Sequence, residues 1–284
     1  MTKDRIGFIG LGNIGKPMAI NLADAGFDLS VYDIHQPSCE ELAAKGAKIG
    51  AGLAEMAGSC NIICICVRDD KDVENILHSP DGILAASSPG TVVVIHSTIR
   101  KGTLLKLADE AKKVNIALID AAISGGATGA QQRKLCYMLG GPAETLERCR
   151  PVFEASAARI IHAGDVGAGL TLKLCNNLMT YASFVAIHES ARLAAASGLS
   201  LDLLKEVGSV NGVVTDLMAN FIEGRNLVRS GCDEETFHNL FAPFAALGLK
   251  DMDAGLDLSV ELGIDLPGAQ RIRELVEAVF FDEY

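Results

Sequence analysis

The sequence predicts an α/β fold, in which a doubly wound sheet is followed by an all-α C-terminal domain joined to it by a long interdomain helix. In the first half, short apolar runs alternate with helical patterns, and a glycine-rich turn follows the first run. From Gly167 onward the strand patterns stop. Alternation of this kind is typical of right-handed βαβ units and of parallel strands buried on both faces.

Seven apolar runs are predicted as strands because they are short, rich in β-branched residues and bounded by polar or glycine-containing segments. Five of them alternate with helical patterns such as residues 17–25 and 101–113, and two more extend the sheet at its far edge. The predicted strands are residues 5–10, 29–33, 61–67, 91–97, 115–120, 135–141 and 159–164. We expect a cofactor-binding domain over residues 1–164 and a second domain over residues 165–284.

The second domain is predicted to contain helices only. The patterns favour one long helix over residues 170–197 and further helices around residues 200–208, 216–225, 241–262 and 267–281. Residues 225–237, RNLVRSGCDEETF, are polar and without clear periodicity. We therefore interpret them as an exposed, irregular connection.

Composition and charge exclude several classes of protein. The net charge of -11 and the pI near 5.0 give no support to a nucleic-acid partner. No uninterrupted apolar run approaches the roughly 20 residues of a membrane span, so no membrane partner is expected. The N-terminus reaches its glycine-rich turn at once, which leaves no room for a signal peptide. The 8 cysteines show neither CxxC pairs nor Cys/His zinc spacing, so we expect a cytoplasmic protein without a metal site.

The segment GFIGLGNIG contains a G-x-G-x-x-G pattern made by Gly10, Gly12 and Gly15, between a predicted strand and a predicted helix. In this context the pattern is typical of Rossmann-type dinucleotide binding. The backbone of the whole turn, which includes Leu11, Asn13 and Ile14 between the glycines, is then expected to surround the pyrophosphate. Asp33 ends the second predicted strand. Because a carboxylate there accepts ribose hydroxyls and repels a 2′-phosphate, the sequence predicts NAD rather than NADP.

Ligands of open parallel sheets lie beyond the carboxyl ends of the strands, so the residues at these ends are further candidates. Val67 and Arg68 follow the third predicted strand, and Thr98 follows the fourth. Thr98 is as consistent with a helix cap as with a ligand contact. Ser124, Gly125 and Gly126 offer a hydroxyl and two backbone amides to a carboxylate, although such a run is also common in ordinary loops.

Lys173 and Asn177 lie one turn apart on the long predicted helix, on a stripe that continues through Thr180, Phe184 and His188. The other faces of the helix are apolar, so we expect it to be packed on both sides with the stripe lining a cleft. A lysine in such a cleft has a pKa lowered by desolvation and exchanges a proton with a substrate hydroxyl. The alternative is a lysine whose charged end simply reaches solvent.

Four stretches together resemble the β-hydroxyacid dehydrogenase family: GFIGLGNIGKPMAINL, DAAISGGATGA, GAGLTLKLCNN and LKDMDAGLDLSVELGIDLP. The resemblance implies that Lys173 is the catalytic lysine and that Asn177 binds substrate beside it. It also implies that Ser124, Gly125 and Gly126 bind the substrate carboxylate, and that Thr98 and Lys250 contact the cofactor. A helical domain that forms a homodimer or homotetramer is a further implication.

Two segments depart from the family pattern. Val67 and Arg68 replace a usual Leu-Pro pair, and the segment from Gly224 to Phe241 is longer than expected. The sequence therefore predicts an NAD-dependent oxidoreductase that interconverts a small β-hydroxy acid and its semialdehyde or keto acid, without identifying the acid. Two alternatives stay open: a reductase of a semialdehyde acid such as tartronate or succinate semialdehyde, and a noncatalytic dinucleotide-binding module.

Overall fold

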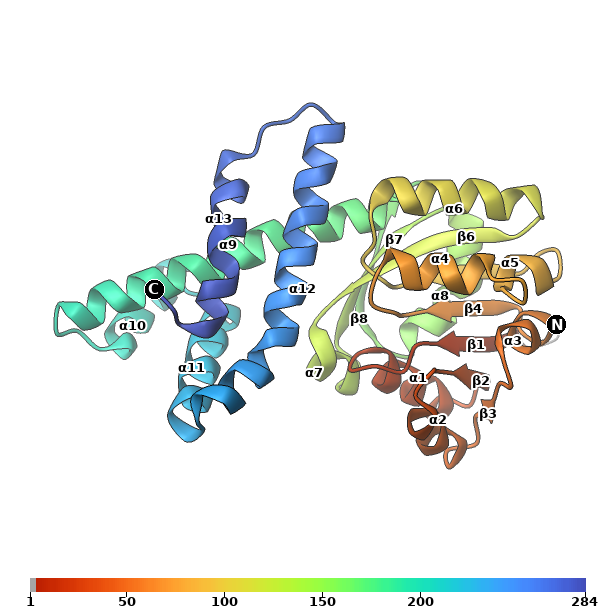
Figure 1. Ribbon diagram of the computed structural model, residues 1–284, viewed down its shortest axis with the longest axis horizontal. Helices are drawn as coiled ribbons and strands as arrows, with labels where there is room; N and C mark the ends of the chain where they lie inside the picture. The colour runs from red at the N-terminus through yellow and green to blue at the C-terminus, as the bar shows by residue number, and fades with distance from the viewer. Residues whose placement is uncertain (1–3) are drawn as a thin grey trace. The chain divides into compact units, whose positions relative to one another are not determined.

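The computed structural model describes residues 4–284 (Figure 1). Contacts between residues divide the chain into two compact units, Met1–Lys173 and Leu174–Tyr284. The division falls within one long helix, α9 (Ala168–Ala196), whereas the boundary predicted from the sequence precedes this helix.

The first unit is built on an eight-stranded sheet with the order β3-β2-β1-β4-β5-β6-β7-β8. Most neighbouring strands are parallel, and β6 and β7 form an antiparallel pair. The strands are β1 (Arg5–Ile9), β2 (Asp28–Tyr32), β3 (Lys48–Ile49), β4 (Ile62–Ile65), β5 (Val92–Ile95), β6 (Ala117–Ser124), β7 (Leu135–Gly140) and β8 (Ala157–Gly164). This architecture confirms the predicted fold class.

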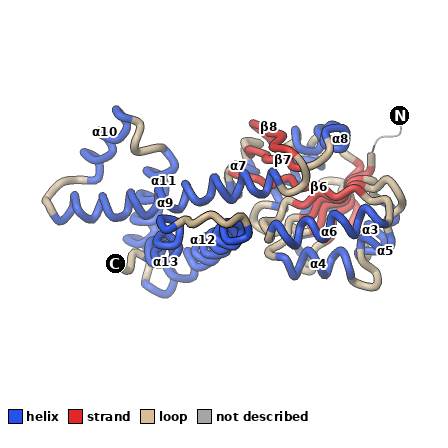
Figure 2. Tube along the Cα trace, turned by 90° about the horizontal axis from the view of Figure 1, so that it is seen from above, coloured by secondary structure: helices blue, strands red, loops and turns tan. Residues whose placement is uncertain are grey.

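Helices cover both faces of the sheet, with α4 and α6 on one face and α8 on the other (Figure 2). On the α8 face, Phe8 of β1, Tyr137 of β7 and Phe153 of α8 are almost fully buried in one apolar core. The helices are α1 (Gly15–Asp24), α2 (Gln36–Ala43), α3 (Leu53–Ser59), α4 (Asp70–His78), α5 (Ile83–Ala86), α6 (Lys101–Lys113), α7 (Gly126–Gln131) and α8 (Ala143–Glu154). Burial on both sides explains why the central strands are continuous apolar runs.

All seven predicted strands are present, and two features differ from the prediction. β3 is a two-residue strand that is too short to show a pattern. β7 runs antiparallel to β6, because only the short helix α7 and a few loop residues separate the two strands. A parallel crossover needs a dozen or more residues, so the chain turns back directly.

The second unit contains most of α9, followed by four helices. These are α10 (Leu201–Asn211), α11 (Asp216–Gly231), α12 (Glu234–Glu261) and α13 (Pro267–Phe281). Ser200, Thr215 and Asp233 cap the starts of α10, α11 and α12 through their side-chain oxygens. The aromatic rings of Phe184 and Phe221 stack with centroids 4.0 Å apart at the centre of this unit.

The prediction of an irregular connection over residues 225–237 is wrong, although most of these residues are exposed as predicted. Helix α11 continues to Gly231 and α12 begins at Glu234, so only a short turn separates them. Arg225 is only 3% exposed, and its guanidinium donates to the carbonyl oxygen of Val279 at 2.6 Å and pairs with Asp282 at 2.9 Å. The polar composition of this segment suggests solvent exposure throughout. Arg225 is nevertheless buried, because its partners Val279 and Asp282 lie more than 50 residues further along the chain.

Within the part of the chain that the structure describes, no helix has the length and apolar character needed to cross a membrane.

Candidate active site

The turn between β1 and α1 holds three glycines with different surroundings. Gly10 has a φ of +94°, and a Cβ atom on it would collide with the carbonyl oxygen of Cys66. A Cβ atom on Gly15 would collide with the carbonyl oxygen of Gly10. A Cβ atom on Gly12 would meet nothing within 4 Å. The turn itself therefore requires Gly10 and Gly15, whereas Gly12 leaves open space for a ligand.

Asp33 follows β2, and backbone amides on two sides hold its carboxylate. Oδ2 accepts a hydrogen bond from the N–H of Leu11 at 2.5 Å, and Oδ1 accepts one from the N–H of His35 at 2.7 Å. The side chain is half-buried, so its oxygens still face the neighbouring space. These contacts connect Asp33 directly to the glycine turn.

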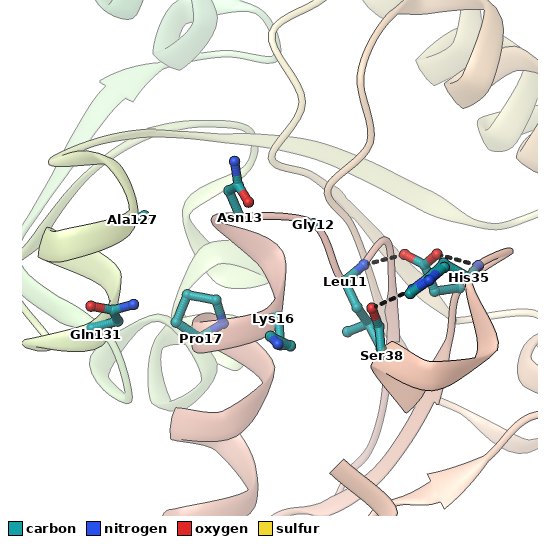
Figure 3. A pocket seen from close by; sticks show the side chains of 10 residues that line it. Leu11, Gly12, Asn13, Lys16, Pro17, His35, Ser38, Ala127 and Gln131 are labelled. Atoms are coloured by element: carbon teal, nitrogen blue, oxygen red, sulfur yellow. Dashed lines mark hydrogen bonds between the residues drawn. The ribbon is translucent and has the colours of Figure 1, made fainter. Parts of the chain in front are cut away.

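A cavity of about 490 Å³ lies against this turn, and Figure 3 shows the side chains around it. Its volume falls within the roughly 300–1,000 Å³ that is usual for small-molecule sites. The lining residues are Leu11, Gly12, Asn13, Lys16, Pro17, Asp33, His35, Ser38, Ala127 and Gln131. No side chain caps the start of α1 beside Ile14. The N–H of Lys16 donates to the carbonyl oxygen of Gly12 and Pro17 has no N–H, so within this first turn Gly15 offers its N–H to an anion. The open glycine, the uncapped helix start and the carboxylate together fit the adenosine and phosphate groups of NAD.

The ends of β4 and β5 lie side by side in the sheet. The N–H of Val67 donates to Oγ of Ser97 at 2.8 Å, and Thr98 is buried beside Ser97. The side chain of Arg68 is 79% exposed and forms two hydrogen bonds with Asp72 on α4. The hydrogen bond from Arg68 holds the pKa of Asp72 below its ordinary value. The structure thus places the guanidinium of Arg68 against α4.

Lys173 lies against the segment that contains Ser124, Gly125 and Gly126. Its Nζ atom donates to the carbonyl oxygen of Ile123, the residue before Ser124, at 3.0 Å. Gly125 and Gly126 have φ angles of +125° and +61°, which side chains rarely adopt. Their backbone conformation turns the chain from β6 into α7 and leaves Ser124 half-buried at the end of the strand.

Sequence reasoning did not identify Asp120, a carboxylate on β6 that is only 2% exposed. Its oxygens accept hydrogen bonds from the N–H groups of Gly167 and Leu170 at the start of α9. Burial raises its pKa, and the backbone hydrogen bonds oppose that rise. A charged residue within the otherwise apolar run NIALIDAAI is the sequence signal that distinguishes it.

In the second unit, Asn177 of α9 is paired with Asp251 of α12. The Nδ2 atom of Asn177 donates to Oδ2 of Asp251 at 2.6 Å. Asp251 is 1% exposed, and its Oδ1 has no hydrogen-bond partner among the described residues. Lys250, predicted to contact the cofactor, is half-buried beside it. Asp251 was also missed, although it is the second residue of the Lys-Asp pair that identified Lys250.

The predicted polar stripe on α9 is correct only in its first half. Lys173 and Asn177 are half-buried, but Phe184 and His188 are enclosed within the second unit. His188 is 0% exposed and accepts a hydrogen bond from the buried Arg225, so it does not line a cleft. Within the single chain one of the two apolar faces is not fully packed, because Met179 on it is 66% exposed.

All 8 cysteines are free thiols. Cys64 and Cys149 are buried in the core of the first unit, and burial raises the pKa of both thiols. Among residues 4–284, no three His, Cys, Asp or Glu side chains are grouped so that they could hold a metal ion.

Comparison with known proteins agrees with this geometry. Residues 5–164 match a family model described as the NAD binding domain of 6-phosphogluconate dehydrogenase. An NAD-dependent L-serine dehydrogenase of Pseudomonas aeruginosa is 37% identical over 72% of this chain and 68% of its own length. A 3-hydroxyisobutyrate dehydrogenase of the same organism is 35% identical over 71% of this chain and 68% of its own.

A solved structure covers both units. The 3-hydroxyisobutyrate dehydrogenase of Mycobacterium tuberculosis, determined with L-serine, superposes with a TM-score of 0.83 and 26% identity over 99% of each chain. The family model includes the glycine turn and Asp33, and the two curated relatives exceed 30% identity. The chain therefore belongs to the β-hydroxyacid dehydrogenase family, whose members are NAD-dependent oxidoreductases that act on the CH–OH group of hydroxy acids.

Proposed function

We propose that this protein oxidises 3-hydroxypropionates substituted at carbon 2, reversibly, to the corresponding semialdehydes. The observation that carries the proposal is the contact between Lys173 and the carbonyl group of Ile123, because it holds a proton-transfer group beside the Ser124 loop. L-Serine and 3-hydroxyisobutyrate, after which the relatives are named, share this chemistry. Both have a carboxylate and a CH₂OH group on the same carbon atom.

In the proposed reaction, Lys173 accepts the hydroxyl proton during oxidation and returns it during reduction. Bound NAD supplies the hydride acceptor. The hydroxyl of Ser124 and the N–H groups of Gly125 and Gly126 hold the substrate carboxylate, and Asn177 holds the reacting oxygen. The Asp251 carboxylate fixes the amide of Asn177 by the 2.6 Å hydrogen bond, which uses one of the two N–H donors of its NH₂ group.

For the cofactor, we propose contacts from the whole glycine turn, from Asp33 and from the two neighbouring strand ends. Gly10, Leu11, Gly12, Asn13, Ile14 and Gly15 surround the pyrophosphate, and Asp33 accepts from the adenosine ribose. Val67 follows β4, which neighbours β1, and Thr98 follows β5, the next strand in the sheet, which favours contacts nearer the nicotinamide. Lys250 remains a proposed cofactor contact. For Arg68 we propose a cofactor contact through its backbone, because its guanidinium pairs with Asp72.

We further propose that the chain forms a homodimer or homotetramer through its second unit. Large apolar side chains on α9 and α10 are exposed in the single chain, among them Leu193 (72%), Val207 (64%) and Val210 (86%). Sedimentation velocity with the wild type and with Val210→Glu tests this, and a monomeric wild type would contradict it. The unpaired thiols support a cytoplasmic location, where cysteines stay reduced.

The proposed function is tested with matched pairs of alcohols. We would measure NADH formation with L-serine and ethanolamine, and with 3-hydroxyisobutyrate and propan-1-ol, because each second compound lacks only the carboxylate. In at least one pair, we expect kcat/KM for the acid to be at least about 100-fold larger than for the alcohol without the carboxylate. The reason is that an unfilled carboxylate site loses several hydrogen bonds. Equal values for both pairs would contradict the assignment of the Ser124 loop. The semialdehydes, tested with NADH, determine which direction is faster.

A further inference from the structure

Asp120, which has no role in the proposed reaction, attaches the first turn of α9 to strand β6. Oδ1 accepts from the N–H of Gly167 at 2.6 Å, and Oδ2 accepts from the N–H of Leu170 at 2.7 Å. An ordinary helix cap comes from a residue directly before the helix. Here the cap comes from a carboxylate 47 and 50 residues earlier in the chain, in the middle of a sheet.

Two glycines make room for this carboxylate. Gly140 of β7 is paired with Asp120 in the antiparallel register, and a Cβ atom on it would collide with Oδ1 of Asp120. A Cβ atom on Gly169 of α9 would lie 2.9 Å from Oδ2 and would collide with the carbonyl oxygen of Met138. The start of α9 therefore rests directly on the backbone of β7, and the Asp120 carboxylate connects it to β6.

The same strand also holds the end of the Lys173 side chain. Ile123 is three residues beyond Asp120 on β6, and its carbonyl oxygen accepts the hydrogen bond from Nζ of Lys173 at 3.0 Å. Leu170, which Asp120 caps, is three residues before Lys173 on α9. β6 thus fixes both the backbone turn that leads to the lysine and the nitrogen atom itself. The strand then ends at Ser124.

We propose that Asp120 is a positioning residue for catalysis, which sets the place of Lys173 relative to the Ser124 loop. This inference rests on the proposed function, in which Lys173 transfers the proton. A cap from a neighbouring residue would stabilise the helix equally well, but it would leave the helix free to shift along β6. The long-range cap couples the lysine and the carboxylate-binding loop to one rigid element. Displacement of a catalytic group by about 1 Å is enough to reduce the rate by roughly 100-fold.

The test uses Asp120→Asn in the full-length protein. The amide has nearly the same shape, but its NH₂ group faces one of the two N–H donors, so that contact is replaced by repulsion. We expect kcat to fall about 10- to 100-fold with L-serine or 3-hydroxyisobutyrate, while the Kd for NADH stays within about twofold. We also expect the primary isotope effect on kcat with the 3,3-dideuterated acid to increase, because proton and hydride transfer become slower than product release.

Two further variants separate positioning from stability. Phe153→Leu changes a core side chain of α8 that is 0% exposed and lies outside the site, so it lowers the melting temperature without moving Lys173. Gly169→Ala disturbs the same turn of α9 from the helix side and leaves Asp120 intact. We expect Gly169→Ala to reproduce the lower kcat and the larger isotope effect, and Phe153→Leu to show neither when all are assayed well below their melting temperatures.

The outcomes distinguish this inference from the proposed function. If Asp120→Asn melts at a lower temperature but keeps the wild-type kcat, isotope effect and pH profile, Asp120 is a structural cap and the inference is overturned. In that case Lys173→Ala still abolishes turnover, and the proposed function stands. If Lys173→Ala keeps its turnover, the proposed function and the inference both fail.

Discussion

The Nζ atom of Lys173 lies 3.0 Å from the carbonyl oxygen of Ile123. This hydrogen bond connects the long helix α9 to the strand that ends in the Ser124 loop. It directs the lysine toward that loop. A lysine at an exposed helix start would instead extend its charged end into bulk water. The contact gives the first prediction its physical basis.

Lys173→Ala is expected to lower kcat/KM about 100- to 10,000-fold, the usual contribution of a positioned acid or base. The Kd for NADH, measured by fluorescence titration, should stay within about twofold of the wild type. Lys106→Ala is the matched control, because Lys106 is an exposed lysine paired with Glu74. Turnover in Lys173→Ala above about one tenth of the wild-type value would exclude a proton-transfer role.

Gly12→Ala should weaken NADH binding, whereas Gly15→Ala should lower the melting temperature. A methyl group at residue 12 meets open space in the free protein, so the melting temperature is expected to stay unchanged while the Kd for NADH rises at least about tenfold. A methyl group at residue 15 collides with the carbonyl oxygen of Gly10, so Gly15→Ala should melt at a markedly lower temperature. Thermal melts with and without NADH measure both effects. Normal NADH affinity in Gly12→Ala would show that the pyrophosphate does not approach this residue.

Asp33→Ser combined with Ile34→Arg should shift the cofactor preference from NAD toward NADP. The double variant removes the carboxylate that repels a 2′-phosphate and adds a cation at a side chain that is 85% exposed. We expect the ratio of kcat/KM for NADP to that for NAD to rise about 10- to 1,000-fold, from the loss of one repulsion and the gain of one ion pair. Ile34→Arg alone keeps Asp33 and is expected to change the ratio much less. An equal ratio in the single and double variants would argue against Asp33 as the determinant.

His96 makes the protein less stable in mild acid. Its ring is buried in the core and stacks on Phe8 with centroids 6.1 Å apart, and burial lowers its pKa from 6.5 to about 4. At pH values between these two pKa values, the imidazole of residue 96 is protonated in the unfolded chain and neutral in the folded chain. The free energy of unfolding therefore falls as the pH falls through this range. The contribution of His96 between pH 7 and pH 5 is about 2 kcal/mol.

Urea unfolding at pH 7 and pH 5 measures this contribution. In His96→Phe the loss of stability between the two pH values should be smaller than in the wild type by about 2 kcal/mol. His78→Phe is the control, because His78 is a partly exposed histidine paired with Glu110. The same pH dependence in His96→Phe and in the wild type would show that His96 takes up a proton in the folded state.

The sequence was sufficient for features that depend on neighbouring residues. The glycine turn and Asp33 are recognisable because their spacing along the chain reflects one βαβ unit, and the strands because each is a compact apolar run. Asp120, Asp251 and Arg225 could not be found in this way. Their partners lie between 37 and 74 residues away, so local spacing does not show what these side chains bind, even where an apolar run marks Asp120 as buried.

Arg225 illustrates the limit most clearly. A polar run without periodicity is usually solvent-exposed, yet the guanidinium of Arg225 is enclosed by His188, Val279 and Asp282. Burial of such a charge requires paired partners on other elements, and these are known only once the helices are packed. The antiparallel direction of β7 is different, because the short connection after β6 already contained that information.

The reversal of direction at β7 matters for protein engineering. After β6 the chain passes through the Ser124 loop, proposed to bind the carboxylate, directly into helix α7, and Ala127 and Gln131 of this helix line the cavity proposed for NAD. A library that randomises residues 127–131 to broaden the range of acids will therefore also change KM for NAD. Substrate range and cofactor affinity cannot be evolved independently through this helix, and selections should score both.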